Sequence, residues 1–145
     1  MKYKHTQFAT VIVVVSLAIA VPLCIFGFSF ARPALIGAII VLLCACLFYS
    51  LTVEVDETEV RWSFGIGLIR KRARLDEIAK AEQVRTNFLE GWGIHLSRYG
   101  WLYNVSGWDA IAFTMKNGKC FAIGTDEPQA LLASVNGIRG ESKRA

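Results

Sequence analysis

The sequence predicts a two-helix transmembrane hairpin followed by a mainly β domain that ends in one α-helix. Two long runs, residues 6–31 and 33–53, carry no charged residue and are separated by Arg32 alone. Each run can supply the roughly 20 apolar residues that cross the hydrocarbon core of a bilayer. After them, apolar and polar residues alternate with the period of two that is typical of strands. We expect spans at about residues 8–28 and 34–52, a domain at residues 53–138 and a flexible tail at residues 139–145.

The first apolar run has an alternative interpretation as a signal peptide. Lys2 and Lys4 precede it, and Ala18-Ile19-Ala20 has the small-x-small form of a cleavage site. A secretory apolar core is typically about 7–15 residues long and then stops. Here the apolar residues continue past Ala20 as far as Phe26. The sequence therefore favours a retained span over a cleaved leader.

The distribution of basic residues predicts a multi-pass protein of the cytoplasmic (inner) membrane with both termini in the cytoplasm. Lys2 and Lys4 precede the first span and several basic residues follow the second, whereas the turn holds one arginine. Positive residues favour the cytoplasmic side. Small residues such as Ala20 and Ala38 predict that the two spans pack on each other. Asp, Glu, Lys and His do not occur in mid-span, which argues against a solitary transporter.

Charge and cysteine content exclude several classes of function for the domain. All twelve acidic residues and thirteen of the sixteen basic residues follow position 50, so the domain is nearly neutral despite its basic pI. A nucleic-acid partner is therefore not expected. Cys24, Cys44 and Cys46 lie in the predicted spans and Cys120 stands alone in the domain. This arrangement indicates neither a disulfide framework nor a metal site, and we expect no cofactor.

The domain begins with a run of predicted strands. Alternating residues indicate strands around residues 53–56, 59–64, 68–75, 94–96, 111–115 and 121–123. Asn117-Gly118 between two such runs is a strong hairpin signal. The third strand is unusual because Arg70, Arg72 and Arg74 share one of its faces.

One amphipathic helix is predicted to close the domain. Thr125 supplies an N-cap, the acidic residues after it suit the helix dipole, and Pro128 is tolerated in the first turn. Leu131, Leu132, Val135 and Ile138 form its apolar stripe. Asn136-Gly137 is expected to end it, so the helix is predicted from about Glu127 to Asn136.

Strands closed by one C-terminal helix resemble a pleckstrin-homology-like (PH-like) barrel. The motifs that carry the resemblance are Val53-Glu54-Val55-Asp56, the strand at residues 70–75 with Ile78, Gly91-Trp92-Gly93-Ile94, the glycine-bounded stretch at residues 100–107, and Ile123-Gly124-Thr125-Asp126-Glu127-Pro128. Together with the preceding hairpin, they resemble bacterial membrane-anchored PH-like proteins of unknown function. The resemblance implies a non-catalytic module held at the cytoplasmic face of the membrane. It transfers no functional residue.

Catalytic patterns are weak in this chain. His95 is the sole histidine of the domain and is predicted to face solvent from a strand. A general base needs an oriented partner and a nucleophile within reach, and the spacing around His95 provides neither. Gly65-Ile66-Gly67 lacks the third glycine and the helix of a dinucleotide fingerprint. We therefore expect a protein that is not an enzyme.

Two groups of residues are candidates for binding. Arg70, Arg72 and Arg74 could attract anionic lipid headgroups, although a solvated face or a charge-protected edge strand explains them as well. Trp92, Trp101 and Tyr103 could form a partner surface or reach the bilayer interface. They belong to an aromatic stretch that also holds Phe88, Tyr99 and Trp108, and core packing is the alternative.

The expected function is therefore a membrane-anchored module that binds a protein partner or an anionic lipid surface. The alternative is an accessory subunit of a membrane enzyme or transporter complex.

Overall fold

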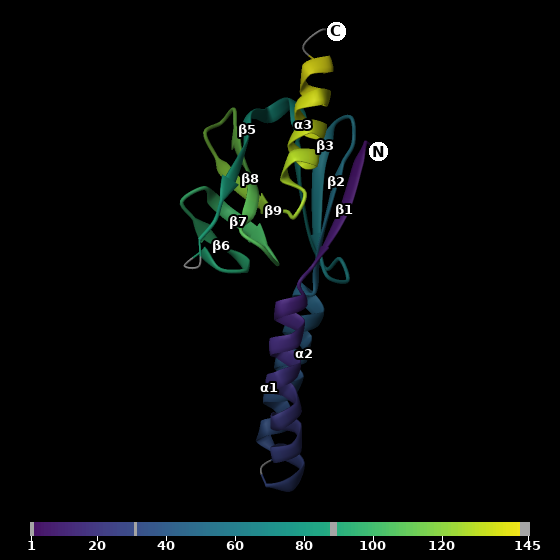
Figure 1. Cartoon of the computed structure of the whole chain (residues 1–145), viewed down its shortest axis with the longest axis vertical. Coiled ribbons are helices and arrows are strands. Elements are labelled where there is room, and N and C mark those ends of the chain that lie inside the picture. Colours follow the sequence, from purple (N-terminus) through teal and green to yellow (C-terminus); the bar gives the residue numbers. More distant parts are fainter. Residues whose placement is uncertain (1, 31, 88–89, 143–145) are drawn as a thin grey trace.

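A computed structural model describes residues 2–30, 32–87 and 90–142 of the chain, with side chains described as far as residue 140. A pair of helices extends from one end of a two-sheet domain, and the C-terminal helix ends near the opposite end (Figure 1). The elements in order are β1 (Tyr3–Phe8), α1 (Thr10–Ser29), α2 (Pro33–Phe48), β2 (Ser50–Val55), β3 (Glu59–Phe64), β4 (Ile69–Arg74), η1 (Leu75–Glu77), β5 (Ile78–Arg85), β6 (Gly93–Ser97), β7 (Gly100–Asn104), β8 (Asp109–Met115), β9 (Cys120–Gly124) and α3 (Pro128–Ser142).

Strand β1 precedes the helices and belongs to the domain. It pairs antiparallel with β2, from Tyr3 opposite Val55 to Phe8 opposite Ser50. The helical pair is therefore an insertion between two neighbouring strands. The sequence prediction began the domain at residue 53 and missed β1, because its partner β2 lies more than 40 residues further along the chain. Pairing of that kind leaves little signal in a six-residue segment.

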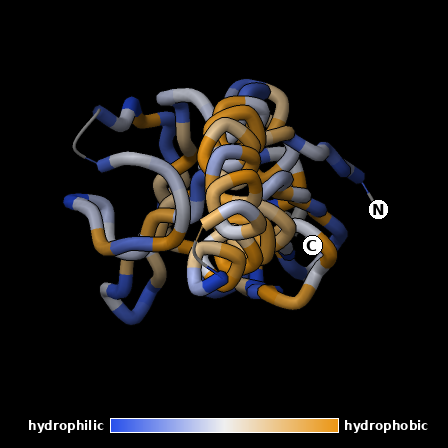
Figure 2. The backbone as a smooth tube through the Cα atoms, turned by 90° about the horizontal axis from the view of Figure 1, so that it is seen from below, coloured by the Kyte–Doolittle hydropathy of each residue, from blue (hydrophilic) through white to orange (hydrophobic). Residues whose placement is uncertain are grey.

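The helical pair has an apolar surface that the domain leaves uncovered. The two helices pack on each other, as the small residues Ala20 and Ala38 predict, and both are buried together with Gly27. Large apolar side chains are exposed along both helices. In Figure 2 the backbone of the helical pair is coloured largely in the orange of hydrophobic residues. Helix α1 is long and apolar enough to cross a membrane. Helix α2 is shorter than the predicted second span, because the chain already enters β2 at Ser50.

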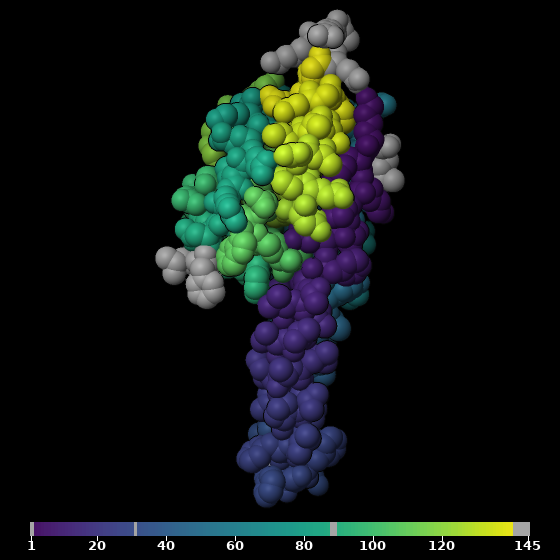
Figure 3. Space-filling view, viewed as in Figure 1, coloured from purple at the N-terminus to yellow at the C-terminus, as the bar shows by residue number. Residues whose placement is uncertain are grey.

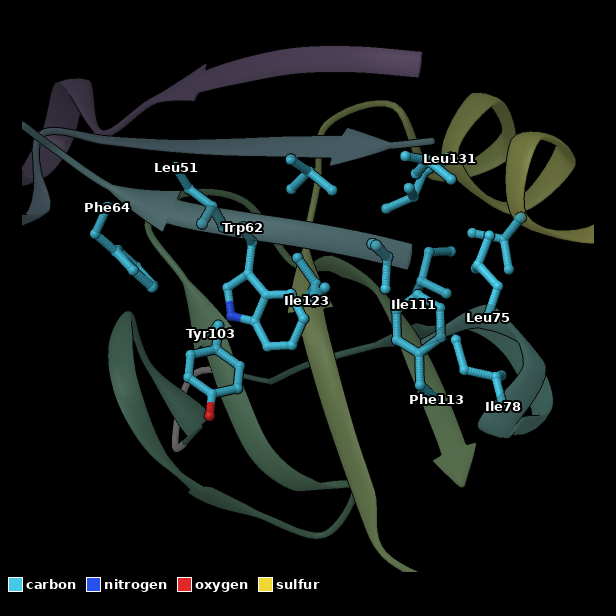
Figure 4. Close-up of a cluster of buried hydrophobic side chains, with 14 of the residues drawn as sticks. Leu51, Trp62, Phe64, Leu75, Ile78, Tyr103, Ile111, Phe113, Ile123 and Leu131 are labelled. Carbon is cyan, nitrogen blue, oxygen red and sulfur yellow. The ribbon is translucent and has the colours of Figure 1, made fainter. Parts of the chain in front are cut away.

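The domain consists of two sheets with a common core. The first sheet has the antiparallel order β1-β2-β3-β4, and the second has the order β5-β8-β9-β7-β6, in which β7 and β9 are parallel. Hairpin β6–β7 lies between β5 and β8 in sequence but joins the sheet at β9, beyond β8. Figure 4 shows side chains of both sheets and of α3 meeting in the core, among them Phe64, Ile111, Phe113 and Leu131.

Helix α3 packs on β5, β8 and η1. Leu131, Val135 and Ile138 are buried, which confirms the predicted stripe, and Leu132 is partly buried. The predicted stop at Gly137 is wrong, because the helix continues to Ser142. Burial of Ile138 and a 2.6 Å hydrogen bond from Arg139 Nη2 to the carbonyl oxygen of Ala79 stabilise this extra length. Residues 139–142 of the predicted tail are thus helical, and residues 143–145 lie outside the described part of the chain.

Candidate functional site

The basic strand β4 lies at an edge of the first sheet. In the described part of the chain it pairs with β3 alone. Arg70, Lys71, Arg72 and Arg74 are exposed along it. Its first residue, Ile69, pairs with Phe64 beside the helices, and Arg74 pairs with Glu59 at the far end. With a rise of about 3.3 Å per residue, Arg74 lies roughly 13 Å further from the helices than Arg70.

The three predicted arginines differ in their partners. Arg74 donates two hydrogen bonds to Asp76, at 3.1 and 2.7 Å, and these bonds hold the pKa of Asp76 below its usual value. Arg72 lies 3.8 Å from a carboxylate oxygen of Glu59. Arg70 Nε donates to the carbonyl oxygen of Gly67 at 2.5 Å. The charge is therefore best compensated at Arg74 and remains available at Arg70.

The end of the first sheet nearest the helices carries exposed apolar side chains. Phe8, Ile66 and Leu68 are 62%, 63% and 72% exposed, and we call them the apolar collar. Gly65 in the β3–β4 turn has a φ of 48°, and a Cβ there would overlap the carbonyl oxygens of Cys46 and Leu47. Only glycine thus lets the turn approach the end of α2 this closely. The collar consequently lies where the apolar helices meet the domain.

A groove of about 1130 Å³ lies between β4 and the second sheet, and we call it the β4 groove. Along β4 its lining runs from Lys71 to Arg74 at the far end, and residues of the β3–β4 turn and of the collar do not line it. Its lining includes basic and apolar side chains from both walls: Lys71, Arg72, Arg74 and Lys119, with Trp62, Leu96, Trp101, Tyr103 and Phe121.

The floor of the β4 groove is a packed aromatic cluster. Trp62 stacks on Phe121 with ring centroids 5.1 Å apart, and Phe121 stacks on Phe113 at 4.9 Å. The Tyr103 ring tilts against Trp62 at 5.2 Å, and burial raises the pKa of its hydroxyl. The buried Nε1 of Trp62 has no hydrogen-bond partner among the described residues, and Figure 4 shows it on the side that faces Tyr103. Such mutual ring contacts give the groove a fixed apolar base.

The β4 groove brings together part of both predicted candidate groups. Arg72 and Arg74 line it from one wall, and Trp101 and Tyr103 from the other. Tyr103 is nearly buried, as the core alternative expects, whereas Trp101 is 52% exposed. Arg70 lies outside it and instead lines a more polar groove of about 650 Å³ on the outer face of the first sheet.

Trp92 lies apart from the β4 groove. Its Nε1 donates to the carbonyl oxygen of Gly107 at 3.3 Å, and its ring lies 6.0 Å from that of Trp108. Gln7 at the end of β1 donates to the neighbouring Ser106 carbonyl at 2.5 Å, which places this loop near the start of α1. Phe88 lies outside the described residues.

Sequence reasoning missed several residues of the β4 groove. Lys71 alternates with the three arginines and was not singled out, yet its edge position lets it reach the rim of the groove. Lys119 and Cys120 reach the groove because they follow the Asn117-Gly118 turn between β8 and β9. Leu96 is 73% exposed opposite Trp101. The sequence showed the turn signal and the alternation in Ile94-His95-Leu96. It did not show that these residues would lie across the groove from β4.

The two histidines, His5 and His95, differ in their surroundings. His95 is half-buried, which corrects the expectation that it faces solvent, and its Nε2 has no hydrogen-bond partner among the described residues. His5 on β1 lies 2.7 Å from Asp126 and 3.4 Å from Glu127, the two residues just before α3. Burial, and then the Glu127 carboxylate, raise the pKa of Tyr3 to about 12. His5 therefore links two segments that lie side by side in Figure 3.

Within the described ranges, His, Cys, Asp and Glu do not form a group of three that could hold a metal ion. Comparison of the chain with protein-family models, curated proteins and solved structures finds no match. Function is therefore inferred from three features: the helical pair, the apolar collar and the β4 groove.

Proposed function

We propose that this protein is a membrane-anchored, non-catalytic PH-like module that binds a protein partner or an anionic lipid surface at the cytoplasmic face of the membrane. One observation carries the proposal. The helical pair is apolar and uncovered, and its two ends continue directly as the paired strands β1 and β2. Burial of that surface in lipid would hold the domain against the bilayer in one orientation.

The helix lengths support a hairpin that spans the membrane twice. At 1.5 Å per residue, the 20 residues of α1 extend about 30 Å, the thickness of a typical hydrocarbon core. The 16 residues of α2 extend about 24 Å. Exposed Phe28 near the end of α1 and Phe30 in the turn provide apolar surface beyond the start of α2, and modest local thinning of the bilayer accommodates the remaining mismatch.

The pairing of β1 with β2 supports a common side for the two ends of the chain. Lys2 and Lys4 lie beside or within β1 and therefore on the same side as the domain and its basic β4 strand. A single basic residue, Arg32, lies at the other end of the helical pair. The positive-inside bias then favours the cytoplasm for both termini.

The strand order supports the PH-like resemblance. Strands β1-β2-β3-β4 form one antiparallel meander and β5-β8-β9 form another, and α3 packs where it can close the core. Hairpin β6–β7 is then an insertion between β5 and β8. The helical pair takes the place of the β1–β2 turn, so one loop of the barrel becomes the anchor.

Lipid binding is best supported at the apolar collar and Arg70. A basic residue near an anionic surface contributes about 1 kcal/mol, and the attraction falls off within a Debye length of about 8–10 Å. Arg70 lies at the helix end of β4, whereas Arg74 lies beyond this range. A protein partner is favoured instead by the exposure of Trp101 and Leu96, which also supports the alternative of an accessory subunit in a membrane enzyme or transporter complex.

Topology measurements test the anchor. A C-terminal alkaline phosphatase fusion should be inactive, and a cysteine introduced as Arg32→Cys should react with an impermeant thiol reagent from the periplasmic side. An active phosphatase would overturn the orientation. An Arg32→Cys thiol that reacts only from the cytoplasm would show that the hairpin enters the bilayer without crossing it. Copurification from native membranes separates the two functions, because a stoichiometric membrane enzyme or transporter supports the subunit alternative.

A further inference from the structure

The β4 groove has features of a peptide-binding site at a sheet edge. Strand β4 pairs with β3 alone among the described strands, so its other edge presents unpaired backbone groups toward the groove. An extended segment can add to such an edge by main-chain hydrogen bonds. The volume of about 1130 Å³ exceeds the roughly 300–1,000 Å³ of ordinary small-molecule pockets. The groove is therefore large enough for an extended segment, and the free edge of β4 favours such a segment.

The charges of the groove select an acidic occupant. Four basic residues line it against two acidic ones, Glu59 and Glu77. Lys71 and Lys119 form no ion pair with the described residues. A second copy of this chain is disfavoured, because antiparallel pairing of two β4 strands would place their cations opposite each other. Basic residues can protect an edge strand from aggregation, but that role does not require the exposed Trp101 and Leu96 on the facing wall.

A lipid headgroup is disfavoured by position. The apolar collar and Arg70, which lie at the helix end of the first sheet, do not line the groove, and its lining along β4 extends to Arg74 at the far end. We therefore propose that the β4 groove binds an extended acidic segment of a partner protein, which pairs with β4 and places apolar side chains against Trp101, Leu96 and Phe121. This inference rests on the proposed function in one respect: the partner is expected in the compartment that holds the domain.

A peptide library tests the inference on the full chain in nanodiscs of zwitterionic lipid. Selection from random decapeptides should enrich sequences in which Asp or Glu alternates with aromatic or aliphatic residues, without proline. Binding of a selected peptide should weaken about tenfold or more for Lys71→Glu/Lys119→Glu and for Trp101→Ala. Lys80→Glu, a charge reversal on β5 outside the groove, is the matched control and should bind within about twofold of the wild type.

Two further readouts test the geometry. A single N-methyl group should abolish binding when it is placed at every second residue of the selected peptide and be tolerated at the residues between. The reason is that alternate N–H groups of an added strand point toward β4. The bound peptide should slow alkylation of Cys120, an exposed thiol in the groove, by an impermeant maleimide. Circular dichroism melts of each variant separate lost binding from lost folding.

Several results would overturn the inference. The selection could enrich no peptide, or it could enrich peptides that are not acidic. The Lys71→Glu/Lys119→Glu variant could bind the peptide as well as the wild type does, or N-methylation could be tolerated at every position. Binding of anionic phosphatidylglycerol vesicles that depends on Lys71 and Lys119, without peptide binding, would assign the groove to lipid instead. None of these results changes the phosphatase topology or the membrane fractionation of the chain, so failure of the groove is distinguishable from failure of the anchor.

Discussion

Asp56 shows how one side chain organises the turn between β2 and β3. Its Oδ1 accepts hydrogen bonds from the backbone N–H groups of Thr58 and Glu59, both at 2.9 Å, and from the Thr58 hydroxyl at 3.0 Å. Arg61 pairs with the other carboxylate oxygen. These bonds, with the backbone of Thr58 first, lower the pKa of Asp56 from its ordinary value of 3.8. The folded turn therefore favours the ionised carboxylate.

Asp56→Ala should make the domain less stable and less sensitive to acid. At neutral pH we expect a loss of about 1–2 kcal/mol, because hydrogen bonds to a charged acceptor disappear. In the wild type, the contribution of Asp56 is full above the unfolded-state pKa of 3.8 and is lost as the pH falls through the lower folded-state pKa. Thermal melts between pH 7 and 2 measure this difference. Glu57→Ala is the control, and an equal acid dependence in wild type and Asp56→Ala would contradict the prediction.

Helix α3 depends on burial more than on its own end signals. Gly137 lies inside the helix, where a stop was expected, because Ile138 beyond it packs into the core. Contacts with β5, β8 and η1 thus outweigh the low helix propensity of glycine, about 1 kcal/mol relative to alanine.

Leu131→Asp should unfold the domain or cost more than about 3 kcal/mol, because an unpaired carboxylate would enter the core where Leu131 is fully buried. Ala133→Asp, one exposed position on the same helix, should cost less than about 1 kcal/mol. Denaturant melts followed by tryptophan fluorescence compare the two variants. If both variants lose a similar free energy of unfolding, Leu131 does not pack in the core as described.

The helical pair and the domain meet at two adjacent strand ends. Phe8 and Ser50 are opposite each other in the β1–β2 ladder, and residues 9–49 between them form the whole helical insertion. The domain therefore includes residues from both sides of the insertion, and a fragment starting near Leu51 would lack its edge strand.

Replacement of residues 9–49 by Asn-Gly should give a water-soluble domain that melts cooperatively, because this dipeptide closes two-residue hairpins. The fragment of residues 50–145, which lacks β1 but keeps all of α3, should be less stable, since β2 then becomes an exposed edge. Circular dichroism and size-exclusion chromatography compare the two proteins. If the fragment is as stable as the joined domain, β1 contributes no part of the fold.

The joined domain also allows lipid binding to be measured without the helical pair. Arg70→Gln should weaken its partition onto anionic vesicles about fivefold, the equivalent of about 1 kcal/mol, and Arg74→Gln should change it less than twofold. Both should leave the melting temperature nearly unchanged, because exposed charges contribute little to folding. Sedimentation with vesicles at 0.1 and 0.5 M salt provides the measurement. If both variants lose the same amount of vesicle binding, or if binding does not depend on salt, Arg70 is a solvent-exposed residue without a role in lipid binding.

Features that depend on near neighbours were predictable from the order of residues alone. The apolar stripe of α3 and the strand alternation follow from periodicities of 3.6 and 2, which a short window contains. The apolar surface of the helices follows from composition. The Asn117-Gly118 hairpin is confirmed, with Gly118 at a φ of 83°.

Features that depend on distant partners required the tertiary structure. The assignment of β1 to the domain, the early end of α2 and the parallel pair β7–β9 each result from pairing between segments far apart in sequence. The same holds for the β4 groove, which residues of both sheets line, among them Arg72 and Trp101. Strand partners and facing walls are chosen by the global fold, since many pairings satisfy the same local alternation and only one buries this core.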